Sequence, residues 1–122
     1  MDAKLIERDS TRIVHITGSN ARIETRQDAL DAVFSHGHTD LAGIAIDQAC
    51  LHPDFFELKT GVAGEILQMF VNYRTAVAIV GVFSHYESDS LRDFIVESNR
   101  GRHVFFAADI DDAIARLTAA NR

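Results

Sequence analysis

The sequence predicts a single α/β domain over residues 1–122, built on a mixed, mostly parallel sheet of about five strands. Short apolar segments with little alternation recur along the chain, which is typical of parallel strands covered on both faces. Segments with helical spacing separate them, and strands that alternate with helices favour a parallel sheet with right-handed crossovers. The predicted element order is β-β-α-β-α-β-α-β-α.

The first two predicted strands form a hairpin. Residues 4–8 and 12–17 alternate apolar and polar side chains around Asp9-Ser10, the pattern of a hairpin with one solvated face. A helix is predicted to begin at Thr25, with Asp28 three residues on as a capping-box variant. The apolar stripe of this helix is Leu30, Val33 and Phe34.

The remaining strands are predicted over residues 41–46, 76–83 and 103–107. The second helix is predicted to follow Gly61, the third to follow Ser88, and the fourth to follow Asp109, an N-cap residue type. Apolar residues at helical spacing support these three helices: Val62, Ile66, Leu67, Phe70 and Val71, then Leu91, Phe94 and Ile95, then Ile110, Ala113, Ile114 and Leu117.

The net charge and the length of the apolar runs argue against two classes of protein, those that bind nucleic acid and those that insert into membranes. The 18 Asp and Glu residues exceed the 12 Lys and Arg residues, so the net charge is −6. This balance argues against nucleic acid as a partner, because binding phosphates needs a basic face. The longest apolar run, residues 76–83, is too short to span a bilayer, and the charged N-terminus resembles no targeting peptide. We therefore expect a cytoplasmic protein that does not insert into membranes.

The start of the second helix is the leading candidate site. Lys59, Thr60 and Gly61 lie where this helix is predicted to begin, and free backbone N–H groups and the helix dipole favour an anion there. These residues predict a place for a phosphate or another anion. The alternative is that Thr60 is simply the N-cap of the helix.

Three loops are expected to meet at the carboxyl edge of the sheet, where open α/β sheets bind ligands. The polar residues of these loops are Asp47 and Gln48 after one strand, Ser84, His85, Tyr86 and Ser88 after the next, and Asp109 after the last. Ser84, His85 and Tyr86 are not favoured as a hydrolytic set, because no Gly-x-Ser-x-Gly elbow accompanies them. Ser88 is better explained as an N-cap.

Cysteine and histidine give little sign of chemistry. Cys50 is the only cysteine, so no intramolecular disulfide is possible, and we interpret it as a small buried side chain rather than a nucleophile. His36 and His38 flank Gly37 at the expected end of the first helix, but no further ligands with metal-site spacing accompany them. The prediction is that the protein uses no metal and no cofactor.

Three segments resemble a known family. They read DFFELKTGVAGEILQMFVNYR, AIVGVFSHYESDSLRDFIVESNRG and HVFFAADIDDAIARL, and on them the chain is identified as a member of the domain of unknown function 4180 family. The resemblance implies a small bacterial α/β domain and no particular reaction. The chain departs from the family pattern at Val82, where an Asp is usual, and at Met69, where a Lys is common.

The element order also resembles the STAS domain of anti-sigma-factor antagonists. Those domains carry an Asp-Ser-Ser-Gly-type word at the start of the second helix, where a partner kinase phosphorylates a Ser. Lys59-Thr60-Gly61-Val62 occupies the equivalent place, so the resemblance implies Thr60 as a phospho-acceptor. Lys59 stands where a Ser is expected, no Asp precedes it, and the loop of residues 47–58 is longer than in that domain.

The leading functional hypothesis is a non-enzymatic regulatory or protein-interaction module with a protein partner. The rival is a small-molecule-binding domain or enzyme in which Lys59 holds a phosphate or carboxylate and His85 acts as acid or base. Phe55 and Met69 would form a docking patch if they lay outside the core. We also expect a homodimer, because the outer strand of the hairpin should leave a sheet edge unpaired; the alternative is a monomer whose edge is protected by its charges.

Overall fold

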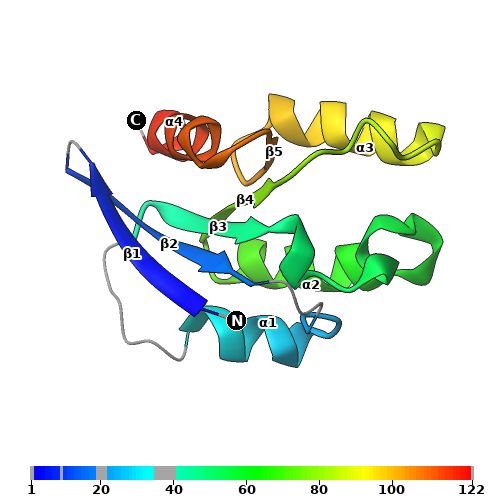
Figure 1. The fold of residues 1–122 in the computed structure, drawn as a ribbon, viewed down its shortest axis with the longest axis horizontal. Coiled ribbons are helices and arrows are strands. Elements are labelled where there is room, and N and C mark those ends of the chain that lie inside the picture. The colour runs from blue at the N-terminus through cyan, green and yellow to red at the C-terminus, as the bar shows by residue number, and fades with distance from the viewer. Residues whose placement is uncertain (1, 9, 19–21, 35–40, 122) are drawn as a thin grey trace.

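The computed structural model describes residues 2–8, 10–18, 22–34 and 41–121. Its elements follow the predicted order (Figure 1). Three short 3₁₀ turns, η1 to η3, lie between β3 and α2. The bounds are β1 (Asp2–Arg8), β2 (Thr11–Thr17), α1 (Arg26–Phe34), β3 (Gly43–Asp47), η1 (Gln48–Cys50), η2 (Pro53–Phe56), η3 (Leu58–Thr60), α2 (Val62–Asn72), β4 (Ala76–Val80), α3 (Asp89–Arg100), β5 (Val104–Ala107) and α4 (Ile110–Ala120).

The five strands form one sheet in the order β1-β2-β3-β4-β5. β1 runs antiparallel to β2, and every later pair is parallel. The fold prediction is therefore confirmed: a mixed, mostly parallel sheet with the N-terminal hairpin at one side. Because the parallel strands run the same way, the loops that follow β3, β4 and β5 meet at one edge, the carboxyl edge.

Helices cover both faces of the sheet (Figure 1). α1 and α2 lie on one face, where the larger core includes Ile44, Ile46, Phe55 and Phe70, all with at most 1% of their surface exposed. α4 lies on the other face over a smaller core, and α3 packs beside β5. Burial on both faces explains why the inner strands show little alternation in sequence.

Small residues under α4 allow the helix to approach the sheet closely. Ala45, Ala78 and Ala107 belong to this core, and Gly43 lies beside them on β3. A Cβ atom at Gly43 would lie 2.7 Å from the Ala76 carbonyl oxygen and 2.7 Å from a methyl group of Leu117. A glycine is therefore required at position 43 because there is no space for a Cβ atom, and not because of its backbone conformation.

Several strand boundaries differ from prediction by one to three residues, and the differences at β4 and at the start of β3 have a clear cause. β4 was predicted to run to Phe83 but ends at Val80. The Gly81 N–H still donates to a β5 carbonyl at 2.9 Å. The next N–H, that of Val82, donates instead to the side-chain oxygen of Gln48 at 3.1 Å. The strand therefore ends where a side chain, rather than a neighbouring strand, accepts the backbone hydrogen bond. β3 begins at Gly43 rather than residue 41, because its pairing with β2 begins there.

Two predicted turns lie partly or wholly outside the described residues. In the hairpin turn, Ser10 has a φ of 70°, as expected of a tight turn, but Asp9 is not described. The predicted end of the first helix at His36-Gly37-His38 also lies outside the described residues.

The two outer strands of the sheet differ in whether their outward-facing backbone groups have hydrogen-bond partners. At β5, the side chain of Asn99 in α3 accepts a hydrogen bond from the Phe106 N–H at 2.8 Å and donates one to the Phe106 carbonyl at 3.3 Å. These bonds satisfy backbone groups that another strand would otherwise pair with. β1 is the other outer strand, and all seven of its residues are at least partly exposed.

We predict that two glycine substitutions have opposite effects. Gly43→Ala should lower the free energy of unfolding by about 1–3 kcal/mol, because the new methyl group overpacks the space between the sheet and α4. Gly64→Ala on the exposed side of α2, where a Cβ meets nothing within 4 Å, should raise it by up to about 1 kcal/mol through helix propensity. Urea unfolding of both variants checks this, and an equal effect of the two substitutions would contradict the close packing of α4.

Candidate functional site

Gln48 joins the loops that follow β3 and β4. Its side-chain nitrogen donates to the Tyr86 hydroxyl at 2.8 Å, and its side-chain oxygen accepts from the Val82 N–H at 3.1 Å. Gly81 leaves room for this side chain, since a Cβ there would lie 2.3 Å from the same oxygen. The structure thus brings together two of the loops that the sequence places at the carboxyl edge, through a bond network that fixes them to each other.

The residues after β4 divide into a packed and an exposed part. The ring of Tyr86 stacks on Phe56, with centroids 5.1 Å apart, and the ring of His85 lies 4.2 Å from that of Tyr86. Ser84 and His85 are exposed, and no hydrogen bond joins them in the described structure. Ser88 caps α3 by accepting from the Leu91 N–H at 3.2 Å, so its interpretation as an N-cap is confirmed.

Asp47, at the end of β3, is paired with a residue that sequence reasoning missed. Its carboxylate lies 2.6 Å from Nε2 of His15 on β2, and the two side chains are 33% and 15% exposed. The alternation of residues 12–17 predicts that His15 shares a face with Ile13, but only the register of β2 with β3 places it beside Asp47. Asp47 therefore has a partner within the sheet.

Cys50 is a buried side chain, as the sequence suggests. Its sulfur lies 3.7 Å from the Ile16 carbonyl oxygen and 3.6 Å from that of Gly18. Burial, and secondarily the negative charge of Asp47, raises the pKa of the thiol to about 11. Because the thiolate is the reactive form, Cys50 is a poor nucleophile at neutral pH.

The segment between β3 and α2 is held against the start of α1 by backbone pairing. Ile23 and Leu51 form an isolated parallel bridge. The Ile23 N–H donates to the Cys50 carbonyl at 3.0 Å, and the His52 N–H donates to the Ile23 carbonyl at 2.9 Å. This bridge places Glu24 and His52, the residues that follow it on each segment, side by side.

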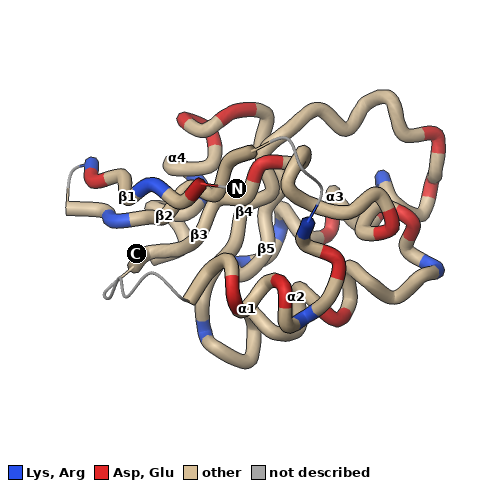
Figure 2. The backbone as a smooth tube through the Cα atoms, turned by 60° about the horizontal axis from the view of Figure 1, so that its bottom comes forward, with Lys and Arg blue, Asp and Glu red and all other residues tan. Residues whose placement is uncertain are grey.

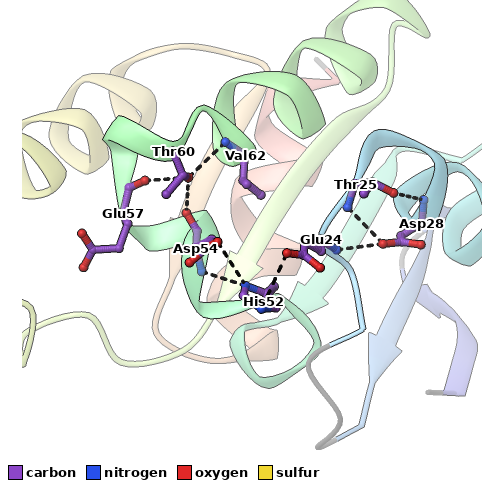
Figure 3. Close-up of polar contacts among 8 residues, drawn as sticks. All are labelled: Glu24, Thr25, Asp28, His52, Asp54, Glu57, Thr60 and Val62. Carbon is purple, nitrogen blue, oxygen red and sulfur yellow. Dashed lines mark hydrogen bonds and ion pairs between the residues drawn. The ribbon is translucent and has the colours of Figure 1, made fainter.

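The Thr60 hydroxyl links the two short turns that precede α2 (Figure 3). It lies 2.7 Å from the Asp54 carbonyl oxygen and 2.8 Å from that of Glu57, and it accepts from the Val62 N–H at 3.3 Å. A hydroxyl has one proton to donate, so the two carbonyl groups share it. Asp54 and Glu57 are thereby tied to the beginning of the helix through one side chain.

Gly61, not Thr60, is the N-cap of α2. It has a φ of 80°, in the left-handed region that favours glycine, and it also ends η3. The alternative interpretation of Thr60 as the N-cap itself is wrong by one residue. The reason is that the turn of residues 58–60 continues up to the helix, so the glycine takes the position where the chain changes direction.

The surroundings of Lys59 are acidic. Lys59 is exposed and forms no ion pair in the described part of the chain, whereas Asp54, Glu57 and Glu65 come from the two turns and the first helical turn next to it. Figure 2 shows acidic residues spread over the helices and the loops before them. These charges weaken the case for a simple anion site at the start of α2.

A capping box fixes the start of α1, as predicted (Figure 3). The Asp28 N–H donates to the Thr25 hydroxyl at 3.1 Å, and the Asp28 carboxylate accepts from the backbone N–H groups of Glu24 and Thr25 at 3.1 and 3.0 Å. The hydrogen bond from the Glu24 backbone lowers the pKa of Asp28, and those from Thr25 lower it further. Burial acts in the opposite direction but is outweighed. The backbone of Glu24 is therefore held from both sides, by this box and by the Ile23 bridge.

Glu24, His52 and Asp54 form a group that the sequence analysis did not predict. Nε2 of His52 lies 3.7 Å from a Glu24 carboxylate oxygen, and Nδ1 lies 3.8 Å from an Asp54 carboxylate oxygen. Nδ1 also accepts from the Asp54 N–H at 3.1 Å, which caps η2. The spacing of His52 and Asp54 was visible in the sequence, but the approach of Glu24 depends on the Ile23 bridge.

The patch that would have involved Phe55 and Met69 does not form, because these residues are 1% and 0% exposed. The exposed large apolar side chains near α2 are instead Phe34, Val71 and Tyr73. Phe34 of α1 lies against Tyr73, with ring centroids 5.0 Å apart.

A model of one protein family covers nearly the whole chain. It is described as Domain of unknown function (DUF4180), and it matches residues 8–117. No curated protein and no solved structure matches the chain, so the resemblance to STAS domains gains no support from them. Among the described residues, no helix has the length and apolar character needed to cross a membrane.

We predict that the Thr60 hydroxyl contributes measurably to stability. Thr60→Val keeps the shape of the side chain but removes the proton donor to two carbonyl groups, and it should lower the free energy of unfolding by about 1 kcal/mol. Thr60→Ser keeps the hydroxyl and should cost less than half as much. Urea unfolding measures the stability of both variants. Equal stability of the valine variant and the wild type would show that these hydrogen bonds do not stabilise the fold.

Proposed function

We propose that this chain, which belongs to the family of the domain of unknown function DUF4180, is a non-enzymatic regulatory module that binds a protein partner through residues 53–61. The observation that supports this most is the bonding of the Thr60 hydroxyl to both turns of the segment. One exposed residue thus controls the shape of an exposed surface next to a helix start.

Modification of Thr60 would change this surface in two ways. A phosphate ester at its oxygen removes the proton that the Asp54 and Glu57 carbonyl groups share, and it adds nearly two negative charges at pH 7. Asp54 and Glu57 also carry carboxylates, so the added charge repels its surroundings. Phosphorylation of Thr60 therefore breaks the bonds that hold residues 53–61 in the conformation described above. The module would have two states, one with these bonds and one without them.

The polar residues of the carboxyl edge support binding more than catalysis. Gln48 and Asp47 are engaged in bonds that hold the fold together, and Cys50 has a raised pKa. Cavities of about 260 and 460 Å³ lie at the opposite edge of the sheet, lined among others by Leu41 and Ala42. The rival proposal, a ligand held by Lys59 and His85, has no comparable geometric support.

We expect partner binding to depend on the state of Thr60. Wild type, Thr60→Ala and Thr60→Glu would be used as baits in the native host, with bound proteins quantified by mass spectrometry. A true partner should bind to wild type. The amount that is bound should change at least about tenfold with Thr60→Glu, since a buried charge in an interface costs more than 1.4 kcal/mol.

Thr75 provides the matched control. Its hydroxyl donates to the Tyr73 carbonyl at 3.2 Å in the loop after α2, and it lies outside the proposed surface. Thr75→Glu adds the same charge and should leave the partner unaffected. Identical partner lists for wild type and both Thr60 variants would rule out the switch.

A second copy of the chain is the partner we propose for β1. If two β1 strands pair antiparallel about Leu5, Asp2 of each copy lies opposite Arg8 of the other, so the charges at both ends are complementary. Arg8 also lies 2.7 Å from Asp111 in its own chain, with both side chains more than half exposed. Such pairing would extend the sheet and satisfy the backbone groups of its exposed edge.

The charge pairing makes the dimer testable. Wild type should have the mass of two chains by light scattering after size exclusion at micromolar concentration. Arg8→Asp should shift the equilibrium toward one chain, and Asp2→Arg combined with Arg8→Asp should restore the dimer by exchanging the charges. A wild-type mass of one chain over the whole concentration range would refute the proposal.

A further inference from the structure

We infer that Glu24, His52 and Asp54 form a binding site for a divalent transition-metal ion of the zinc type. This inference does not depend on the proposed role of Thr60. It rests on one imidazole and two carboxylates whose ligand atoms all lie within 4.8 Å of one another. Imidazole nitrogen and carboxylate oxygen are both ordinary zinc ligands.

The three residues are held in place by their backbones (Figure 3). The Ile23–Leu51 bridge sets Glu24 beside His52, and the capping box holds the Glu24 N–H through the carboxylate of Asp28 at 3.1 Å. Asp54 follows His52 in the first turn of η2. The site therefore draws on two chain segments fixed to each other, which lowers the cost of assembling it around an ion.

The three side chains lie close together without direct side-chain hydrogen bonds between them. The distances of 3.7 Å from Nε2 of His52 to Glu24 and 3.8 Å from Nδ1 to Asp54 are too long for hydrogen bonds. An ion binds only one of these two nitrogens, and with one ligand atom from each residue the three atoms lie within 4.8 Å of one another. In a tetrahedral zinc site with bonds of about 2.0–2.1 Å, two ligand atoms lie about 3.4 Å apart, so binding requires rotation of the two carboxylate side chains, which are 51% and 46% exposed.

The ligand set favours one class of ion. Mg²⁺ and Ca²⁺ prefer oxygen ligands alone, whereas imidazole favours zinc and its neighbours in the transition series. With a neutral imidazole, the two carboxylates match the double charge of the ion. Three protein ligands leave the fourth tetrahedral position to water, and the 34% exposure of His52 gives the ion access from solvent.

Ion binding would change the start of η2. Nδ1 of His52 now accepts from the Asp54 N–H at 3.1 Å. Ligation through Nδ1 uses the same lone pair, and ligation through Nε2 moves the ring proton to Nδ1. Either mode ends this hydrogen bond, so the amide of Asp54 reports ion binding directly.

The test is calorimetric titration of the full-length protein with zinc chloride. Wild type should bind one Zn²⁺ per chain at this site, and Glu24→Gln and His52→Asn should each weaken this binding about tenfold or more, because each removes a ligand. His52→Asn keeps an N-cap residue in front of η2. Thermal melts without metal verify that the variants fold.

Two control variants separate this site from other histidines. His103→Asn removes an exposed histidine of the loop before β5, and the double variant His36→Asn/His38→Asn removes the His-Gly-His word of the sequence; both should bind as wild type does. Zinc should also shift the amide resonance of Asp54 in wild type. Unchanged affinity in Glu24→Gln and His52→Asn, or loss of binding in the His36/His38 variant alone, would overturn the inference and leave the Thr60 proposal untouched.

Discussion

Two backbone hydrogen bonds between Ile23 and the segment around Leu51 fix the course of the chain after β3. The residues between β3 and α2 form three short 3₁₀ turns, and these two bonds attach that long connection to the segment before α1. With them, Phe55 is carried into the core, His52 reaches Glu24, and the turn that Thr60 closes begins in a defined place. The candidate sites on this surface all depend on that pairing.

The same region shows why polar residues at a sheet edge do not by themselves indicate catalysis. Gln48 satisfies a backbone N–H where β4 leaves the sheet, and Asp47 is paired with His15. Thr60 closes a turn. Each uses its polar atoms to end a strand or a turn without leaving buried groups unsatisfied. We propose that the parts of this region that act on other molecules are the exposed surface of residues 53–61 and the group around His52.

The fold was largely predictable from sequence, whereas the site was only partly so. Periodicity and capping residues predicted the α-helices and strands of the described structure but not η1 to η3. Ser88, Asp109 and the Thr25–Asp28 box are local signals. The end of β4 was wrong, since it depends on Gln48, more than thirty positions earlier in the chain. His15 and Glu24 were missed for the same reason: their partners are set by strand register and by an isolated bridge, which no local pattern records.

Hydrogen exchange followed by NMR tests most directly whether residues 47–61 form a fixed surface. We expect slow exchange, relative to an unstructured peptide, for two sets of amides. Those of Ile23 and His52 form the bridge, and those of Glu57, Thr60 and Gly61 close the turns. In Thr60→Val, protection should fall for the turn amides and persist for the bridge. Exchange of all five amides at the unprotected rate in wild type would show that residues 47–61 do not form a fixed surface.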